Sequence, residues 1–230
     1  MASSDFSPDT FLDLSATIAS PLFSGLESVW DAIPLIAAFV GSLLARPPEG
    51  YERVSEHVIA HREALISPRA ELRGPAVIGK GAEIGPGAWL RASVIVGNFA
   101  VVGNSSELKN CILFDGALAP HFNYVGDSIM GRSSHLGAGA ILSNQRSDKG
   151  EVFVRSRDGT PIATGLLKFG AILGDRVEVG CNAVCFPGSL VGRDATIYPL
   201  TPIRGFIPAS SIVKQGGAIV SKSEGSSRGR

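Results

Sequence analysis

From residue 66 onward, aliphatic side chains return at every sixth position of the chain. They are Ile66, Leu72, Ile78, Ile84, Leu90, Val96, Val102 and Leu108. A second series, four positions after each of these, consists mostly of small residues such as Ala76, Ala82 and Ala88. Repeats of six residues are typical of a parallel β-helix, whose stacked coils of short strands and turns bury a continuous aliphatic column. The pattern predicts a mainly β protein with a β-helix domain over residues 66–214.

This register is interrupted at two places. Pro120 stands where an aliphatic residue is due, and the repeat resumes out of phase at Met130, which predicts an excursion with four extra residues near 119–129. A second, polar interruption near 144–167 is expected to form a hairpin around residues 157–160. Loops on a rigid scaffold often carry function, so both excursions are candidate locations for a site.

The chain on either side of the repeat has a different pattern. Apolar residues recur at helical spacing in Trp30, Ile33, Ala37, Val40 and Leu44, which predicts a small α-helical appendage over residues 1–65, with a second, charged helix over 51–65. We expect the apolar stripe to cap the first coil, because an open coil end exposes unpaired backbone. Residues 215–230 are rich in Gly, Ser, Lys and Arg and are expected to be disordered.

Composition narrows the class of protein further. The 230 residues carry 21 basic and 21 acidic side chains, so no net charge attracts the chain to nucleic acid or to an anionic membrane. The apolar stretch 33–45 is shorter than the roughly 17 to 25 residues of a membrane helix. An odd number of cysteines (Cys111, Cys181 and Cys185) and the lack of a signal-peptide pattern favour a reduced, cytoplasmic environment.

The most specific motif of the chain runs from His121 through Tyr124 to Gly126 and Asp127, and is followed by Gly-Ala-Gly at 137–139. Here the sequence resembles the acetyltransferase domain of bacterial glucosamine-1-phosphate acetyltransferase/N-acetylglucosamine-1-phosphate uridyltransferase. It also resembles the archaeal sugar-1-phosphate nucleotidylyltransferases. The resemblance covers approximately residues 90–204. It implies a left-handed β-helix, acetyl-CoA as co-substrate, and a homotrimer whose active sites lie between the β-helices of neighbouring subunits.

The resemblance also assigns roles to individual residues. It implies that His121 is the general base and that Asn144 helps to hold the reacting amine. It implies substrate contacts at Arg91, Lys109, Tyr124, His135 and Lys149, and a cofactor path along Ala138, Cys181, Pro199 and Lys214; no metal site is expected. Arg91 and Lys109 lie 18 residues apart, which is one coil of three repeats, so they should stack on adjacent coils and form a phosphate clamp.

These residue types suit acyl transfer from a thioester to an amine. A sugar ammonium group must lose a proton before it attacks, and histidine titrates near neutral pH, so His121 fits a general base. Backbone N–H groups of residues 137–139 can approach the developing oxyanion closely because the side chains there are small.

The sequence thus predicts an acetyl-CoA-dependent N-acyltransferase acting on an amino-sugar phosphate or a nucleotide-linked amino sugar, without the nucleotidyltransferase domain of its relatives. His135 and residues 145–149 depart from the family pattern, so the acceptor sugar and the acyl length stay open. One alternative is an acyltransferase of lipid A synthesis. Another is a catalytically silent sugar-nucleotide-binding or regulatory subunit. A zinc-dependent, carbonic-anhydrase-like protein is disfavoured, because such a site needs a third histidine in the repeat.

Overall fold

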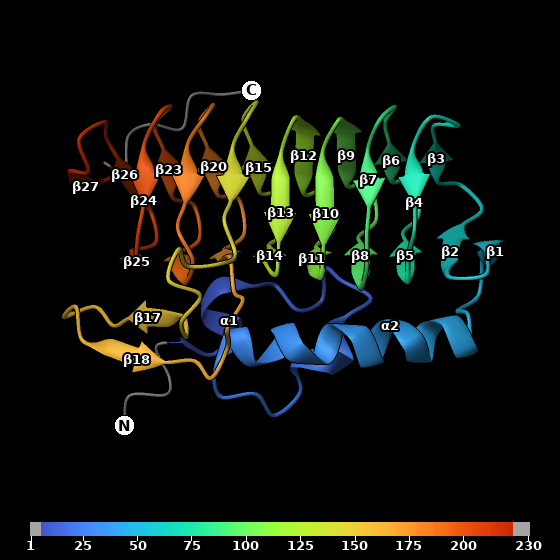
Figure 1. The fold of residues 1–230 in the computed structure, drawn as a ribbon, viewed down its shortest axis with the longest axis horizontal. Helices are drawn as coiled ribbons and strands as arrows, with labels where there is room; N and C mark the ends of the chain where they lie inside the picture. The colour runs from blue at the N-terminus through green and yellow to red at the C-terminus, as the bar shows by residue number, and fades with distance from the viewer. Residues whose placement is uncertain (1–5, 223–230) are drawn as a thin grey trace.

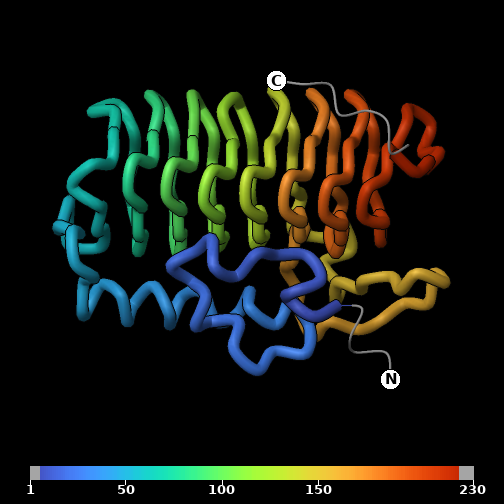
Figure 2. The backbone as a smooth tube through the Cα atoms, turned by 180° about the vertical axis from the view of Figure 1, so that it is seen from behind, coloured from blue at the N-terminus to red at the C-terminus, as the bar shows by residue number. Residues whose placement is uncertain are grey.

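The computed structural model describes residues 6–222, which form a long parallel β-helix with the N-terminal segment and a hairpin lying along one side (Figures 1 and 2). Over these residues, the coils contribute to three sheets of nine, nine and seven strands, and a separate two-stranded sheet forms the hairpin. The parallel β-helix predicted from the six-residue repeat is confirmed.

Each sheet is a ladder of very short strands, which pair in parallel from coil to coil except for one antiparallel pair at the first end of sheet A and one at the last end of sheet B. Sheet A contains β1 (Tyr51–Ser55), β2 (Val58–His61), β5 (Ala76–Ile78), β8 (Val94–Val96), β11 (Cys111–Leu113), β14 (Ile129–Met130), β19 (Ala171–Leu173), β22 (Ser189–Val191) and β25 (Phe206–Ile207). Sheet B contains β3 (Leu65–Ile66), β6 (Glu83–Ile84), β9 (Val101–Asn104), β12 (Leu118–His121), β15 (His135–Leu136), β20 (Glu178–Val179), β23 (Thr196–Ile197), β26 (Ser211–Val213) and β27 (Ile219–Ser221). Sheet C contains β4 (Glu71–Leu72), β7 (Trp89–Leu90), β10 (Glu107–Lys109), β13 (Tyr124–Gly126), β16 (Ile141–Leu142), β21 (Val184–Cys185) and β24 (Pro202–Ile203).

The interior of the coils is filled by columns of aliphatic and small side chains. Leu90, Leu108, Val125 and Leu142 form one such column, because they occupy equivalent positions of β7, β10, β13 and β16 and are fully buried. Burying one aliphatic side chain contributes about 1.5–3 kcal/mol. The column repeats from coil to coil, so stability accumulates along the solenoid.

The coil around residues 119–129 has no bulge, and it and the coils next to it are one residue shorter than the earlier coils. Leu113 pairs with Val96 on one side and with Met130 on the other, so the chain advances 17 residues per turn here, against 18 between Ile78 and Val96. The predicted excursion of four extra residues is therefore wrong. The loss of one residue per turn shifts the register, and Ala119 occupies the inward position that a strict six-residue step assigns to Pro120.

The N-terminal segment packs along the outer face of sheet A and does not cap the first coil. It contains α1 (Pro8–Phe11), two short 3₁₀ helices (Ser20–Phe23 and Val29–Leu35) and α2 (Ile36–Ala45), the one longer helix among the described residues. Its buried side chains form one cluster with outward-facing aliphatic residues of sheet A, including Val77, Ile95 and Ile112. Figure 1 shows α2 running along the long axis of the solenoid, next to this sheet and across the direction of its strands. The prediction that this segment caps the first coil is wrong, because the outward-facing residues of sheet A form a long apolar surface that the segment covers instead.

A buried carboxylate anchors the segment to the coils. Asp175 lies at a turn between sheets A and B, and its side-chain oxygens accept the backbone N–H groups of Asp13 (2.7 Å) and Arg132 (2.8 Å). Burial raises the pKa of Asp175, and the hydrogen bonds to Arg132 and Asp13 and the charge of Arg193 oppose that shift.

The predicted helix over 51–65 is wrong, because β1 and β2 occupy that range as an antiparallel pair. Val58, Ile59 and Ala60 are buried, and β2 pairs in parallel with β5, so the solenoid begins before residue 66. The prediction of disorder is wrong for residues 215–222, which contain β27 paired with β26. Residues 223–230 lie outside the described residues.

The second interruption does form the predicted hairpin. β17 (Phe153–Arg155) pairs antiparallel with β18 (Pro161–Ala163), and Gly159 adopts a left-handed φ of 87° in the turn. Val152 and Val154 join the buried cluster beneath the N-terminal segment. Over residues 6–222 no helix is both long and apolar enough to cross a membrane.

Candidate active site

The outer face of sheet C carries a hydrogen-bonded polar cluster around Asp127. This residue is only 4% exposed, and one of its carboxylate oxygens accepts Lys109 Nζ at 2.9 Å and the side-chain amide of Asn144. The other oxygen accepts Asn110 Nδ2 at 2.9 Å. Asn144 Oδ1 lies 3.4 Å from the hydroxyl of Tyr124, which donates to it. The structure therefore brings together three residues predicted for the site, Lys109, Tyr124 and Asn144, around a carboxylate that positions two of them.

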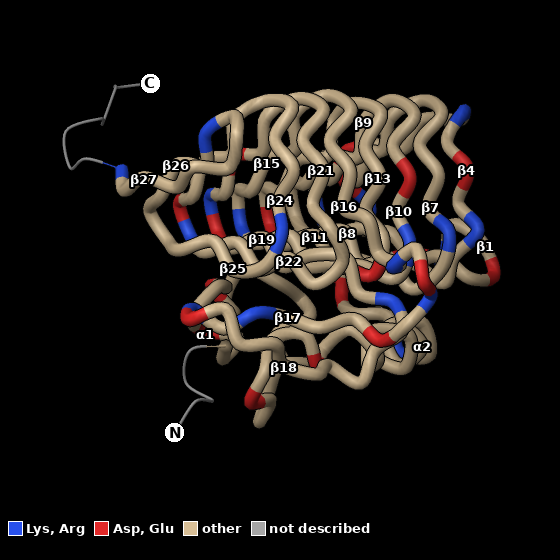
Figure 3. The backbone as a smooth tube through the Cα atoms, turned by 60° about the vertical axis from the view of Figure 1, so that its left-hand side comes forward, with Lys and Arg blue, Asp and Glu red and all other residues tan. Residues whose placement is uncertain are grey.

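Arg91 stands one coil before Lys109, as predicted from their spacing. Its backbone N–H donates to Leu108 O, and Leu90 pairs with Leu108, so the two cations follow equivalent positions of adjacent strands. Arg91 Nη1 donates to Glu107 Oε1 at 2.8 Å, and its guanidinium lies 4.9 Å from the centre of the Trp89 ring. Basic and acidic residues lie close together near β7 and β10 (Figure 3). Both members of the predicted phosphate clamp are thus paired with an acid.

The surroundings of Tyr124 favour its neutral phenol. Burial raises the pKa of Tyr124 most, and the carboxylates of Glu107 and Asp127 raise it further. The positive charge of Arg91 and the hydrogen bond to Asn144 lower it less. A neutral hydroxyl can donate a hydrogen bond at neutral pH, which suits contact with a sugar oxygen or a phosphate.

His121 lies at the corner where sheet B turns into sheet C, just before Tyr124. Its side chain is exposed, and no hydrogen bond from the imidazole is found within residues 6–222. Its backbone N–H donates to Asn123 Oδ1 at 3.0 Å. Asn123 is buried inside the coil and donates from Nδ2 to Gly137 O (2.9 Å) and Ala140 O (3.2 Å). Asn123 therefore fixes the corner that presents His121.

Three residues near the site were missed by the sequence analysis. Asn123 takes an inward corner position that Ala140 and Ala183 occupy on later coils, a signal visible only once the shorter register is known. Trp89 orients Arg91 and gave no signal in the repeat pattern. Phe122 is 59% exposed with a left-handed φ of 53°, a conformation that is unusual for a large side chain. It places an aromatic ring at the surface beside His121.

The predicted cofactor residues line one edge of the solenoid. Gly139 N–H donates to His121 O, Asn182 N–H to Ala138 O, and Leu200 N–H to Cys181 O. His121, Ala138, Cys181 and Pro199 thus occupy the same corner on successive coils.

Lys214 lies at the C-terminal end of this edge, next to Pro199. It follows Val213, which pairs with Ile197, so it stands one coil beyond Tyr198 and next to Pro199. The geometry therefore arranges all four cofactor candidates in one row with His121, and this row leads toward the C-terminal coils.

Two predicted substrate contacts lie apart from the polar cluster. His135 is on the outer face of sheet B, where its Nδ1 is 2.8 Å from Glu178 Oε2. Lys149 is exposed in the loop after Asn144 with a φ of 57°, and no contact of its side chain is found in the described part of the chain. A pair between Arg146 and Asp148 holds this loop, with Nε to Oδ1 at 2.9 Å. Within residues 6–222 there is no group of three or more His, Cys, Asp or Glu side chains arranged to hold a metal.

The coils, the corner hydrogen bonds and the aliphatic columns define a hexapeptide-repeat β-helix protein. Residues 72–213 match the family described as the GMPPB C-terminal domain. Because this match covers more than half of the chain, the chain belongs to that family.

Curated relatives of the chain include proteins described as bifunctional. The bifunctional sugar-1-phosphate nucleotidylyltransferase/acetyltransferase of Sulfurisphaera tokodaii is 39% identical over 95 residues, which are 41% of this chain and 23% of that protein. The bifunctional protein GlmU of Stutzerimonas stutzeri is 34% identical over 151 residues, which are 66% of this chain and 29% of that protein. The resemblance inferred from the His121–Asp127 motif is confirmed. The matches span about a quarter of the length of these relatives.

Solved structures with a related fold include the acetyltransferase domain of PglB from Neisseria gonorrhoeae FA1090 in complex with acetyl coenzyme A. It is 18% identical, with a TM-score of 0.36 over 70% of this chain and 56% of that one. A hexapeptide transferase family protein from Anaplasma phagocytophilum is 15% identical, with a TM-score of 0.41 over 73% of this chain and 81% of that one.

Proposed function

We propose that the chain is an acyl-CoA-dependent N-acyltransferase that uses acetyl-CoA and acts on an amino-sugar phosphate or a nucleotide-linked amino sugar. The observation that carries this proposal is the placement of His121 at the head of the corner row, directly before the coil segment that bears Tyr124 and Asp127. The similarity to acetyltransferase-bearing relatives supports the same class of reaction. In this proposal the solenoid works as a soluble homotrimer in the cytoplasm.

His121 acts as the general base in the proposed reaction. Its exposed imidazole takes a proton from the acceptor ammonium group, and the free amine attacks the thioester carbonyl. A C–N bond forms, the C–S bond breaks, and the second proton that the nitrogen loses on forming the amide passes to the departing CoA thiolate. General-base catalysis of this kind is typically worth about 10²–10⁴-fold in rate.

One backbone group stands out as the donor to the oxyanion. Gly137 N–H donates to Val179 O and Gly139 N–H donates to His121 O, so both are occupied. The N–H of Ala138, between them, has no acceptor within the described residues. A preorganised donor without a partner stabilises the charge that develops on the carbonyl oxygen during attack.

The test is release of free CoA from acetyl-CoA, measured by chromatography, with glucosamine 1-phosphate, galactosamine 1-phosphate and a UDP-linked amino sugar as acceptors. We expect turnover with at least one acceptor and a loss of about 10²-fold or more in His121→Ala. His57→Ala, an exposed histidine before β2, is the matched control and should keep native activity. Equal rates in both variants would remove His121 from the reaction.

A second candidate function is a catalytically silent subunit that binds a sugar nucleotide. The observation in its favour is the neutralisation of the predicted clamp, since Arg91 pairs with Glu107 and Lys109 pairs with Asp127. Binding of a sugar nucleotide to a folded protein that releases no CoA with any acceptor would support this function over the first.

A further inference from the structure

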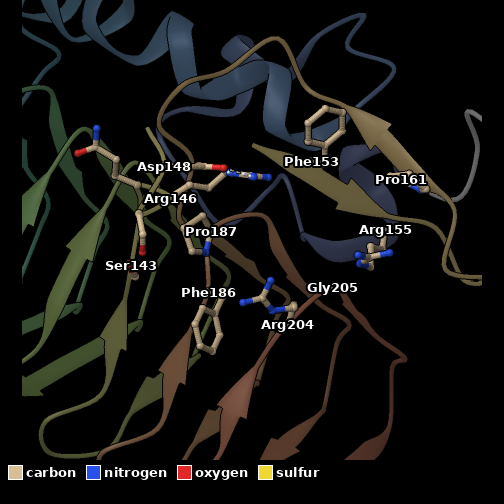
Figure 4. Close-up of a pocket in the computed structure, with 12 residues that line it drawn as sticks. Ser143, Arg146, Asp148, Phe153, Arg155, Pro161, Phe186, Pro187, Arg204 and Gly205 are labelled. Carbon is tan, nitrogen blue, oxygen red and sulfur yellow. Dashed lines mark hydrogen bonds and ion pairs between the residues drawn. The ribbon is translucent and has the colours of Figure 1, made fainter. Parts of the chain in front are cut away.

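A pocket of about 490 Å³ opens between the ends of β21 and β24 and the hairpin of β17 and β18 (Figure 4). We call it the arginine pocket. Its charged and aromatic lining residues are Arg146, Arg155, Arg204, Asp148, Phe153 and Phe186. Ser143 and Gln145 also line it. Because these two residues flank Asn144, the arginine pocket begins where the polar cluster of sheet C ends.

The arginine pocket holds positive charge that no acid compensates. Arg204 stacks with its guanidinium 4.5 Å from the centre of the Phe186 ring, and Arg155 donates from Nη1 to Gly159 O at 3.0 Å. Neither is in an ion pair within residues 6–222, whereas Arg146 is paired with Asp148. Three guanidinium groups and one carboxylate thus leave an excess of positive charge around the cavity.

In the predicted phosphate clamp, by contrast, both cations are already paired with acids. Lys109 is paired with the buried carboxylate of Asp127, and Arg91 with Glu107. A phosphate bound there would compete with acids that are already in place, one of them 6% exposed at its side chain. Guanidinium groups bind phosphate through paired, charge-assisted hydrogen bonds. Along the face of sheet C, the arginines suited to new phosphate contacts are those of the arginine pocket.

We infer that the arginine pocket binds the nucleotide half of a nucleotide-linked amino sugar. Arg155 and Arg204 contact the diphosphate, and the base packs against Phe186 and Phe153, whose side chain is 42% exposed. The volume lies within the roughly 300–1,000 Å³ of small-molecule sites. This inference rests on the proposed function, because it assigns the acceptor of that reaction to the nucleotide-linked class.

The position of the pocket along the solenoid fits such an acceptor. β13, β16, β21 and β24 are consecutive strands of sheet C. Strands in a sheet are about 4.7–4.9 Å apart, so Arg204, just after β24, lies about 14 Å along the axis from the strand of Tyr124. A sugar 1-phosphate held at Tyr124 is too short to reach Arg204. A diphosphate that links the sugar to a nucleoside extends the acceptor in that direction.

Isothermal titration calorimetry on the full chain tests the inference with UDP, GDP, inorganic phosphate and glucosamine 1-phosphate as probes. We expect at least one nucleoside diphosphate to bind more tightly than inorganic phosphate and glucosamine 1-phosphate. Arg155→Gln and Arg204→Gln should each weaken that binding about tenfold. Arg69→Gln, an exposed arginine on an early coil, is the matched control and should bind as the native chain does. Arg155 and Arg204 are both exposed, so these two variants should fold.

The inference is overturned if neither nucleoside diphosphate binds, or if the two pocket variants bind as tightly as Arg69→Gln. CoA release separates this result from failure of the proposed function. Nucleotide binding that depends on Arg204 without CoA release from any acceptor would remove the acyltransferase and keep the pocket. CoA release with glucosamine 1-phosphate but no nucleotide binding would keep the acyltransferase and remove the pocket.

Discussion

Replacing Asn123 by alanine should destabilise the coil that presents His121, for reasons that the hydrogen bonds make explicit. The side chain is 2% exposed and makes three hydrogen bonds to backbone groups, at 3.0, 2.9 and 3.2 Å. A buried polar group that loses its partner costs about 1–3 kcal/mol, and an ordinary hydrogen bond contributes about 0.5–1.5 kcal/mol net. Because Gly137 O also accepts Ala140 N–H, it keeps one partner. We therefore expect a loss of about 2–4 kcal/mol in the free energy of unfolding.

Steric effects contribute little to this estimate. Ala88, Ala140 and Ala183 occupy the same inward corner on other coils, so an alanine side chain fits the position. Thr201 stands at this corner of a later coil and is fully buried, but its hydroxyl makes only one long contact, 3.4 Å to Pro199 O. Thr201→Ala is therefore the matched control, with an expected cost of about 1 kcal/mol or less.

The assay is urea unfolding followed by circular dichroism, at one protein concentration, because assembly would make the midpoint depend on concentration. Asn123→Ala should unfold at clearly lower urea than Thr201→Ala, with an unchanged slope. The same variant should also slow CoA release, because the backbone N–H of His121 loses its acceptor. Equal midpoints for Asn123→Ala and the native chain would refute the argument that these hydrogen bonds fix the corner.

Two further predictions test the packing of the coils. Ile112 is fully buried between sheet A and the N-terminal segment, so Ile112→Ala should lower the free energy of unfolding in urea by about 2–5 kcal/mol. The control is Leu65→Ala, at a residue that is 62% exposed, which should change that free energy by about 0.5 kcal/mol or less. Similar losses in the two variants would show that the segment is not packed on sheet A. In thiol titration, burial raises the pKa of Cys185 to about 12 and also raises the pKa of Cys111, so only exposed Cys181 should react with Ellman's reagent before unfolding. Rapid reaction of a second thiol, or of native-like Cys181→Ser, would contradict this burial.

The sequence was sufficient to predict the solenoid because each coil repeats the same local rule. An aliphatic residue every six positions predicts an inward column without knowledge of distant contacts, and Leu72, Leu90 and Leu108 follow that rule. The rule fails where the turn length changes from 18 to 17 residues, because one missing residue moves every later side chain by one position. The predicted bulge at 119–129 and the failure to notice Asn123 have this single cause.

The packing of the N-terminal segment could not be predicted from the repeat. Ile95 and Ile112 lie in the middle of three-residue strands whose outer members point inward, so these strands are apolar on both faces. Such a strand predicts that something covers its outer face, but the repeat does not say which segment does. Asp175 shows the same limit. The repeat assigns it no role, and only the structure shows that its carboxylate accepts the backbone N–H of Asp13, 162 positions earlier in the chain.

The charges of the site also depend on contacts that sequence spacing leaves open. The separation of 18 positions between Arg91 and Lys109 predicts that the two cations stack, and they do, but spacing gives no information about which acids accompany them. Asp127 holds both Lys109 and Asn144, so one buried carboxylate organises the residues around the proposed acceptor amine. A preorganised polar wall of this kind orients a sugar better than it attracts a phosphate, because its cations are already neutralised. The unpaired arginines beyond Asn144 are then the groups near sheet C that are most suited to bind an anion. For this reason the arginine pocket, and not the pair Arg91 and Lys109, indicates that the acceptor is a nucleotide-linked amino sugar.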